Sequence, residues 1–143
     1  MRNATDALVC LQENGYRITT TRQAVNDVLY RLKGPFTIEE LSDALPGIGR
    51  ATAFRTVRLF QDLGIICRVN LEDGSARYQL ASTGEHHHHF ICTECGVVTE
   101  FIDAHIDQAV NRQAQGANFE LNAHTIDLYG IGSCCSKKCS TNS

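Results

Sequence analysis

The sequence predicts an α+β protein in which an N-terminal winged helix-turn-helix domain is followed by a small α/β domain. Three observations predict this fold. Apolar residues recur at helical spacing in four segments before residue 64, two short apolar segments follow around a polar turn, and the composition changes near residues 82–84. The chain has 143 residues, 43% hydrophobic and 20% charged, so it can form two small folded domains and is not a disordered chain.

The first domain is expected to contain helices and then a hairpin. The helices are predicted at residues 4–14, about 21–33, about 38–45 and about 50–63, and the strands at residues 65–71 and 76–80. Thr37 and Glu40 have the spacing of a capping box for the third helix. Gly15 and Gly64 end the first and fourth helices, and the turn at residues 72–75 joins the two strands. This order of elements is typical of a winged helix.

The second domain is expected to be a small α/β module. Strands are predicted at residues 89–92, 97–101 and 118–129, and an amphipathic helix at residues 103–115. Few core residues and several strand edges suggest a dimerisation domain, because so small a module is marginally stable alone. We therefore place the winged-helix domain at residues 1–81, a hinge at 82–84 and the dimerisation domain at 85–143.

Charge and cysteine content differ between the two halves. Residues 1–84 carry a net charge of +1 and residues 85–143 a net charge of −4, and the second half holds all six histidines and five of the seven cysteines. An odd number of cysteines cannot pair completely within one chain. The sequence shows neither a signal-peptide pattern nor a long apolar run, so we expect a cytoplasmic protein without a membrane partner, whose cysteines bind metal rather than form disulfides.

Cys92 and Cys95 form a Cys-x-x-Cys-Gly motif between two predicted strands. Two thiolates at this spacing can bind one tetrahedral zinc ion. A redox-active pair and ordinary free thiols are the alternatives, but redox-active pairs stand at a helix start. The second half of the zinc site is predicted to be Cys135 and Cys139, with Cys134 as the competitor for one position.

Residues 86–89 are four consecutive histidines inside the chain, where an expression tag is not expected. In an extended segment, successive side chains point to opposite faces. His86 and His88 then share one face, while His87 and His89 share the other. One short segment can therefore supply two imidazoles to each of two separate metal sites.

The fourth helix has the features of a recognition helix in the DNA major groove. Ala51, Thr52 and Arg55 project on one side of its first turns, where Arg55 could bind guanine. Other arginines could neutralise phosphates. A solvated charged face is the alternative, which the winged-helix context disfavours. The predicted DNA-contacting residues are Arg17, Arg22, Arg50, Ala51, Thr52, Phe54, Arg55 and Arg58.

In order and spacing, these motifs resemble those of ferric uptake regulator family repressors along nearly the whole chain. The family has a recognition helix of the type A-T-V-Y-R, a His-rich stretch, C-x-x-C-G, and a distal His before L-Y-G. The corresponding segments here are residues 51–55, 86–89 and 92–96, and His124 ahead of residues 128–130. The resemblance implies a homodimer that binds a palindromic double-stranded DNA operator when it is loaded with a metal corepressor.

The resemblance also implies two regulatory metal sites. The site within the dimerisation domain corresponds to His86, His88, Asp107 and His124. The interdomain site uses His87 and His89, and often the carboxylate that corresponds to Glu100. Its other ligands come from the DNA-binding domain in the family.

On the DNA-binding side, this sequence departs from the family pattern. Pro35 and Gln79 replace the His and the acidic residue of iron and peroxide sensors, and Ala81 replaces a Cys of zinc sensors. Cys67 stands where zinc sensors have an Asp, and it is either an interdomain ligand or a small buried residue. A thiolate with two imidazoles and a carboxylate favours Zn²⁺ over Fe²⁺, with other divalent metals behind them. Gly132 replaces the first C-terminal Cys of the family.

The function predicted from these residues is a metal-responsive transcriptional regulator, a repressor of metal-uptake or metal-homeostasis genes, with structural Zn²⁺ and regulatory Zn²⁺ or Fe²⁺. The alternative is a peroxide or thiol-redox sensor on the same scaffold, which the cysteines at positions 134, 135 and 139 would permit. The chain lacks the His-x-Glu and Pro-Cys-x-x-Cys motifs of zinc deaminases, and it has no nucleophile-base motif. We therefore expect no enzymatic activity.

Overall fold

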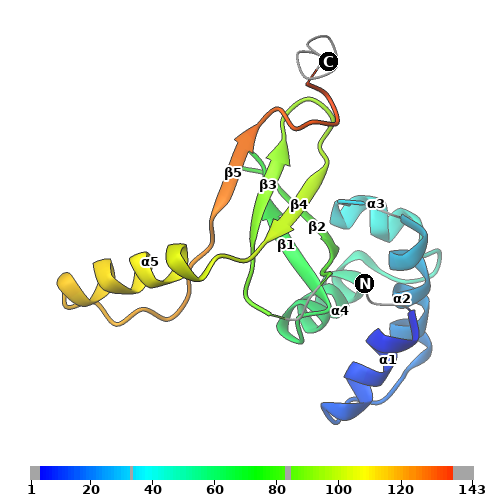
Figure 1. The fold of residues 1–143 in the computed structure, drawn as a ribbon. Helices are drawn as coiled ribbons and strands as arrows, with labels where there is room; N and C mark the ends of the chain where they lie inside the picture. Colours follow the sequence, from blue (N-terminus) through cyan, green and yellow to red (C-terminus); the bar gives the residue numbers. More distant parts are fainter. Residues whose placement is uncertain (1–3, 33, 83–84, 137–143) are drawn as a thin grey trace. The chain divides into compact units, whose positions relative to one another are not determined.

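The computed structural model describes residues 4–32, 34–82 and 85–136. The chain divides into two compact units, residues 1–85 and 86–143 (Figure 1). Helices and two separate small sheets confirm the predicted α+β class. Among the described helices, none combines the length and the apolar character that crossing a membrane requires.

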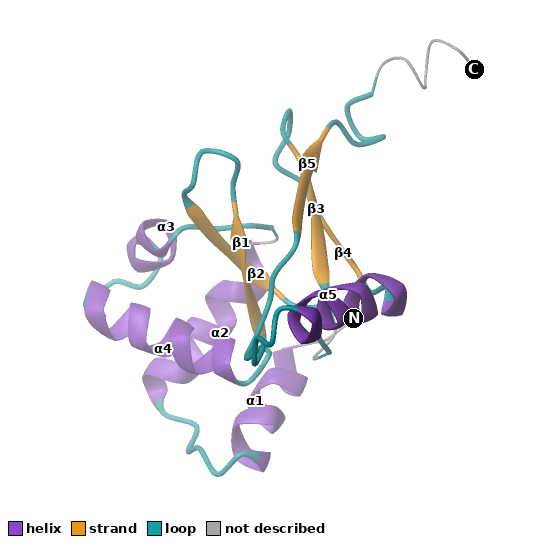
Figure 2. Cartoon of the chain, turned by 90° about the vertical axis from the view of Figure 1, so that its left-hand side faces the viewer, coloured by secondary structure: helices purple, strands orange, loops and turns teal. Residues whose placement is uncertain are grey.

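The first unit is a helical domain with a two-stranded wing (Figure 2). Its elements are α1 (Ala4–Glu13), α2 (Thr20–Leu32), α3 (Ile38–Asp43), α4 (Arg50–Asp62), β1 (Ile66–Asn70) and β2 (Ala76–Leu80). The expected capping box starts α3, because the Glu40 N–H donates to Thr37 Oγ1 at 3.1 Å and the Glu40 carboxylate accepts from the Thr37 N–H. Strands β1 and β2 are antiparallel, with Ile66 opposite Leu80 and Cys67 opposite Gln79.

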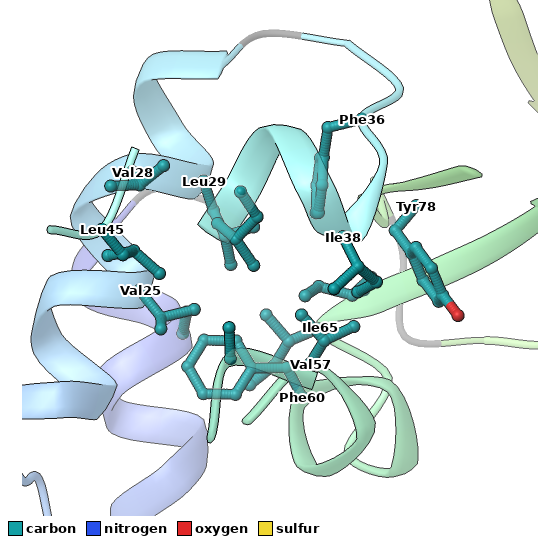
Figure 3. Packing of buried hydrophobic residues seen from close by; sticks show 14 of the residues in the cluster. Val25, Val28, Leu29, Phe36, Ile38, Leu45, Val57, Phe60, Ile65 and Tyr78 are labelled. Atoms are coloured by element: carbon teal, nitrogen blue, oxygen red, sulfur yellow. The ribbon is translucent and has the colours of Figure 1, made fainter. Parts of the chain in front are cut away.

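The core of this unit lies among its helices and the base of the wing (Figure 3). Leu11, Val25, Leu41, Phe60 and Ile65 come from different segments, and none of them exposes any surface. Burying one side chain of this size stabilises the fold by roughly 1.5–3 kcal/mol. Phe60 lies on the buried face of α4, which packs on the other helices, and the opposite face of α4 stays exposed.

The second unit is a three-stranded sheet with one helix. Its elements are β3 (His88–Cys92), β4 (Val98–Phe101), α5 (Ala104–Gly116) and β5 (Asp127–Gly130). The strand order is β4-β3-β5, so β3 is central. It pairs antiparallel with β4 and parallel with β5, and His89 therefore lies opposite Glu100 on one side and Asp127 on the other.

The expectation of a strand over residues 118–129 is wrong for most of that range. Residues 119–126 have no regular structure, and only Asp127–Gly130 pair with β3. Asn118 has a positive φ of 53°, which turns the chain after α5. The apolar alternation of this segment is compatible with a strand, but β5 can pair only along the short length of β3.

Few apolar side chains are buried in the second unit. Among its described residues, Ile91 and Cys92 are the buried hydrophobic ones, and α5 contributes none. Several large apolar side chains of the sheet region are 40–58% exposed, namely Phe90, Val97, Leu128, Tyr129 and Ile131. A sheet with so much exposed apolar surface needs a cover, and this is typical of a dimerisation domain.

Candidate metal centres and nucleic-acid interface

The four histidines alternate between two faces, as the extended backbone predicts. The His86 and His88 rings meet edge to face with centroids 4.7 Å apart, and the His87 and His89 rings do the same at 4.9 Å. Strand β3 starts at His88, so its pleat directs His88 and His89 to opposite faces, where each meets one of the two preceding rings.

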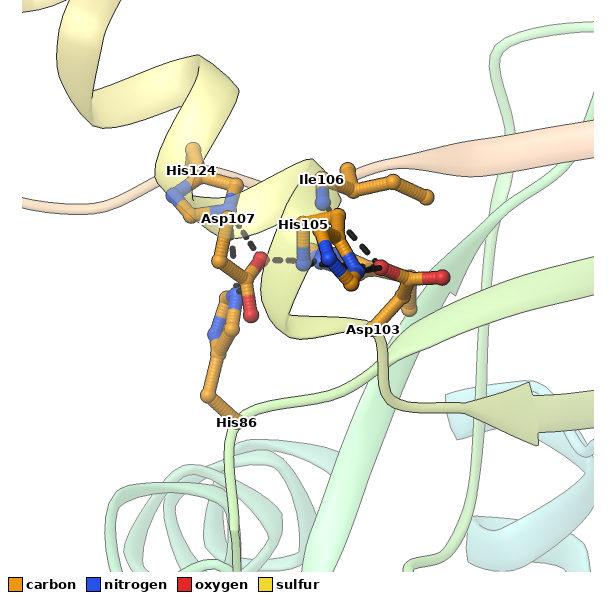
Figure 4. Close-up of polar contacts among 7 residues, drawn as sticks. His86, Asp103, His105, Ile106, Asp107 and His124 are labelled. Carbon is orange, nitrogen blue, oxygen red and sulfur yellow. Dashed lines mark hydrogen bonds and ion pairs between the residues drawn. The ribbon is translucent and has the colours of Figure 1, made fainter.

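His86, of the first pair, faces the carboxylate of Asp107 on α5 (Figure 4). Asp103 caps this helix by accepting the N–H groups of His105 and Ile106 at 2.8 and 3.2 Å. Asp107 lies one turn later, and its Oδ1 is 2.7 Å from His88 Nε2. The cap therefore fixes the helix end that carries this carboxylate.

His124 completes this group from the segment before β5. Its Nε2 lies 3.2 Å from Asp107 Oδ1 and 3.1 Å from His86 Nε2. The potential ligand atoms of His86, His88, Asp107 and His124 lie within 4.8 Å of one another. Three imidazoles and one carboxylate are a suitable ligand set for Zn²⁺ and for other first-row divalent metals.

The charges in this group match a cation site. Burial, and next the neighbouring His124 and His88 rings, lower the pKa of His86. The hydrogen bond with His88 lowers the pKa of Asp107, with a smaller contribution from His124. His86 is thus shifted towards its neutral form and Asp107 towards its anion. These are the forms that bind metal. His88 is fully buried, and its Nδ1 has no hydrogen-bond partner among the described residues.

The second pair faces two other carboxylates. His87 Nε2 lies 3.0 Å from Glu100 Oε1 on β4, and His89 Nδ1 lies 2.9 Å from Asp127 Oδ1 on β5. All four side chains are at most 11% exposed. Cys67, the remaining predicted ligand of this set, is a half-buried residue of β1 in the first unit.

Cys92 and Cys95 flank the turn between β3 and β4. Gly96 has a φ of 79°, in the left-handed region that favours glycine, and its N–H donates to the Cys92 carbonyl at 2.8 Å. Two thiols from the segment after β5 join this turn. The sulfur atoms of Cys92, Cys95, Cys134 and Cys135 lie within 4.8 Å of one another.

The predicted ligand Cys139 lies outside the described residues, whereas Cys134 and Cys135 both lie within the cluster. Gly132, at the position of the absent family cysteine, lies next to Cys134 in this arrangement. A Cβ atom on Gly132 would lie 3.4 Å from Cys134 Sγ. Cys134 is the competing ligand in the sequence prediction. The tertiary structure brings its sulfur atom to 3.4 Å from the Cys95 sulfur atom.

The thiols of this cluster differ in acidity. Backbone hydrogen bonds from Gly132 and Cys95 lower the pKa of Cys92 to about 6, so it is a thiolate at neutral pH. The hydrogen bond with Cys95 raises the pKa of Cys135 to about 12, and it also raises the pKa of Cys134. Metal binding to the cluster would therefore displace protons from the thiols of Cys134 and Cys135.

Helix α4 presents the predicted DNA-contacting residues on its solvent side. Ala51, Phe54, Arg55 and Arg58 are exposed, whereas Ala53, Thr56, Val57 and Phe60 are buried. Arg55 Nη2 donates to Thr52 Oγ1 at 3.2 Å. A surface hollow between α3, α4 and the wing is lined by Arg50, Ala51, Phe54, Arg55, Ser75 and Tyr78.

Of the other predicted arginines, Arg22 and Arg50 form contacts within the first unit. Arg22 Nη1 donates to the Arg17 carbonyl at 2.8 Å, and its guanidinium lies 5.5 Å from the centre of the Tyr16 ring. A second hollow contains Arg22, Thr52 and Arg55. Arg50 forms an ion pair with Glu39 on α3.

Arg77 of β2 is a further basic residue of the wing and lies outside the predicted DNA-contacting set. Arg77 Nη1 lies 3.2 Å from Glu40 Oε1, so the α3 carboxylates hold one arginine of α4 and one of the wing. Its place in the second wing strand is visible in the sequence, but its contact with α3 depends on the fold.

A winged helix with an exposed arginine-bearing helix, together with clusters of His, Asp and Cys, defines a class of metal-responsive DNA-binding proteins. Residues 13–129 match the ferric uptake regulator family. The chain therefore belongs to this family, whose members are metal-responsive transcriptional regulators and not enzymes.

Relatives with different regulatory roles are similar to the chain over most of its length. A ferric uptake regulation protein of Legionella pneumophila is 33% identical over 126 residues, which cover 85% of this chain and 92% of the relative. The peroxide-responsive repressor PerR of Staphylococcus saprophyticus is 30% identical over 137 residues, with 93% and 91% covered. A zinc uptake regulator solved in complex with zinc and DNA shares the fold, with a TM-score of 0.80, 21% identity, and 98% and 99% covered.

Proposed function

We propose that this protein is a zinc-responsive repressor of metal-uptake or metal-homeostasis genes in the cytoplasm. Its sensing site would consist of Cys67, His87, His89 and Glu100, and its operator would be a palindromic DNA duplex. The observation that carries the preference for zinc is the composition of the wing. Strands β1 and β2 have the sequences ICRVN and ARYQL, in which Cys67 is the one thiol, imidazole or carboxylate.

A metal held between the wing and the histidines would therefore bind a thiolate from the wing. Thiolate and imidazole ligands suit tetrahedral Zn²⁺, whereas carboxylate-rich octahedral sites suit harder ions. Gln79, opposite Cys67, is a neutral amide where iron and peroxide sensors of the family carry an acid. Loss of that acid removes the hard ligand that would favour iron.

The remaining metal sites have other proposed roles. The group His86, His88, Asp107 and His124 lies within the second unit, so a metal there would adjust its stability and response rather than link the two domains. The cysteine cluster would hold structural zinc through Cys92 and Cys95 with two of the later cysteines. Cys135 is in the predicted set, and its nearness to the pair supports it. The cluster also contains Cys134, the competitor of Cys135 for a place beside Cys139.

A direct test is operator binding titrated with each metal. The operator is selected from random duplexes with zinc-loaded protein, and binding is then measured with buffered Zn²⁺, Fe²⁺ or Mn²⁺ under anaerobic conditions. We expect Zn²⁺ to support binding at the lowest free concentration. If Fe²⁺ supports operator binding at a lower free concentration than Zn²⁺ does, the zinc proposal is contradicted.

A thiol-redox or peroxide sensor is the second candidate. It is favoured by the 3.4 Å distance between the Cys95 and Cys134 sulfur atoms and by the likeness to a peroxide-responsive repressor. Oxidation of the cluster would release its metal and the DNA. Under this alternative, mild peroxide abolishes operator binding of the zinc-loaded protein and a thiol reductant restores it. Under the zinc proposal, DNA binding survives peroxide concentrations that leave bulk thiols reduced.

Arg55 is expected to contribute sequence specificity and Arg58 general DNA affinity. Arg55→Ala should weaken operator binding by about 1–3 kcal/mol with little change on random DNA, because a guanidinium can bind one guanine edge through two hydrogen bonds. Arg58→Ala, the matched control on the same helix, should weaken binding to both DNAs and reduce the salt dependence. The measurement is fluorescence anisotropy with both duplexes at several salt concentrations. An unchanged specificity ratio in Arg55→Ala would mean that α4 is not the reading helix.

A further inference from the structure

His89 and Asp127 form a closely fitted pair inside the second unit. Strands β3 and β5 lie side by side (Figure 1), and their parallel pairing sets His89 opposite Asp127. The backbone N–H of His89 also donates to the Ile126 carbonyl at 3.1 Å. The Asp127 Oδ1 lies 2.9 Å from His89 Nδ1. Both side chains are at most 8% exposed, so backbone pairing and burial hold the ring and the carboxylate in one geometry.

This geometry distinguishes the two nitrogens of the imidazole. A carboxylate accepts hydrogen bonds, so in a neutral ring it keeps the proton on Nδ1 and leaves a lone pair on Nε2. The Nε2 of His89 is buried and has no hydrogen-bond partner among the described residues. Buried polar atoms are seldom left without a partner, and a metal ion is one partner that accepts this lone pair.

We propose that Asp127 is a positioning residue that fixes the tautomer and the orientation of His89, so that Nε2 binds the sensed metal. This inference rests on the proposed sensing site. Asp127 acts through Nδ1 of the ring and is not itself a ligand, whereas Glu100, which lies near Nε2 of His87, belongs to the proposed ligand set. The negative charge of Asp127 also makes the imidazole a stronger donor to a cation.

The first measurement is the tautomer of His89 in the full-length protein with its structural zinc and no other metal. Heteronuclear NMR of the ring nitrogens at about pH 8, above the ordinary titration range of histidine, should show the proton on Nδ1. Asp127→Ala should lose this preference. Glu120→Ala removes an exposed acid of the same unit and should keep it. Retention of the Nδ1 proton in Asp127→Ala would overturn the inference.

The second measurement is the affinity for Zn²⁺ itself, in a chelator-buffered titration. All variants carry His124→Ala, so that the other histidine site does not obscure the result. We expect Asp127→Ala to weaken zinc binding by about 10–100-fold, as is usual when the carboxylate behind a metal-bound histidine is removed. Asp127→Asn keeps the size of the side chain and an oxygen acceptor but loses the charge, and it should fall between Asp127→Ala and the parent. It also tests the inference if the alanine variant does not fold.

Two failures are distinguishable. If His89→Ala abolishes zinc binding while both Asp127 variants bind like the parent, the positioning role is overturned and the proposed sensing site stands. If His89→Ala itself leaves zinc affinity unchanged, the proposed sensing site is overturned and the inference with it. If Glu120→Ala weakens zinc binding as much as Asp127→Ala does, the effect comes from the loss of negative charge in general, and the inference is also overturned.

Discussion

Replacing Cys92 by serine is expected to release about one zinc ion per chain and to dissociate the dimer. Cys92 is the cysteine whose pKa is lowered to about 6 by backbone N–H groups, so it offers a ready thiolate to the metal. The sheet unit buries few apolar side chains among its described residues, and metal binding and folding then share one free energy. Zinc content by elemental analysis and mass by light scattering report both effects.

Cys10→Ser is the matched control for this experiment. Cys10 is a half-buried thiol on α1 of the first unit and is not part of the cysteine cluster. It should keep both the zinc and the dimer. Cys95→Ser should behave like Cys92→Ser, because each variant removes one ligand of the same turn. If a dimer persists without zinc in both cluster variants, the metal is not structural.

Removing the proposed interdomain ligands is expected to abolish metal-dependent DNA binding. A metal that binds Cys67, His87 and His89 well in only one arrangement of the two domains shifts the population towards that arrangement. By linkage, operator DNA should tighten metal binding by the same factor by which the metal tightens DNA binding, typically about 5–150-fold. Cys67→Ser and His87→Ala should each remove most of this coupling, measured as operator affinity with and without Zn²⁺.

His124→Ala is the comparison for the switch. It removes one ligand of the group that lies wholly within the second unit, so it should shift the zinc response or the thermal stability while metal dependence remains. The opposite pattern would assign the switch to the other site: full metal dependence in Cys67→Ser and His87→Ala, and none in His124→Ala. Unfolding curves of all three variants separate loss of coupling from loss of fold.

Local patterns in the sequence were sufficient for much of the architecture. Helical spacing of apolar residues predicts the helices of the first unit, and Thr37 with Glu40 predicts the start of α3 that the capping hydrogen bonds confirm. The strand predicted over residues 118–129 failed where local alternation was not matched by a partner strand. Apolar alternation alone does not supply a neighbour for backbone hydrogen bonds.

The sequence by itself determined that the four histidines divide into two pairs, because alternation is a property of any extended chain. The family resemblance implied Asp107 for one pair and Glu100 for the other, but only the tertiary structure showed these contacts and added Asp127. Asp107 reaches His88 through the placement of α5, and Asp127 meets His89 because β5 lies parallel to β3 in one register. Those contacts join residues 19 and 38 positions apart. They depend on strand pairing and helix placement, which the whole fold selects and no local pattern encodes.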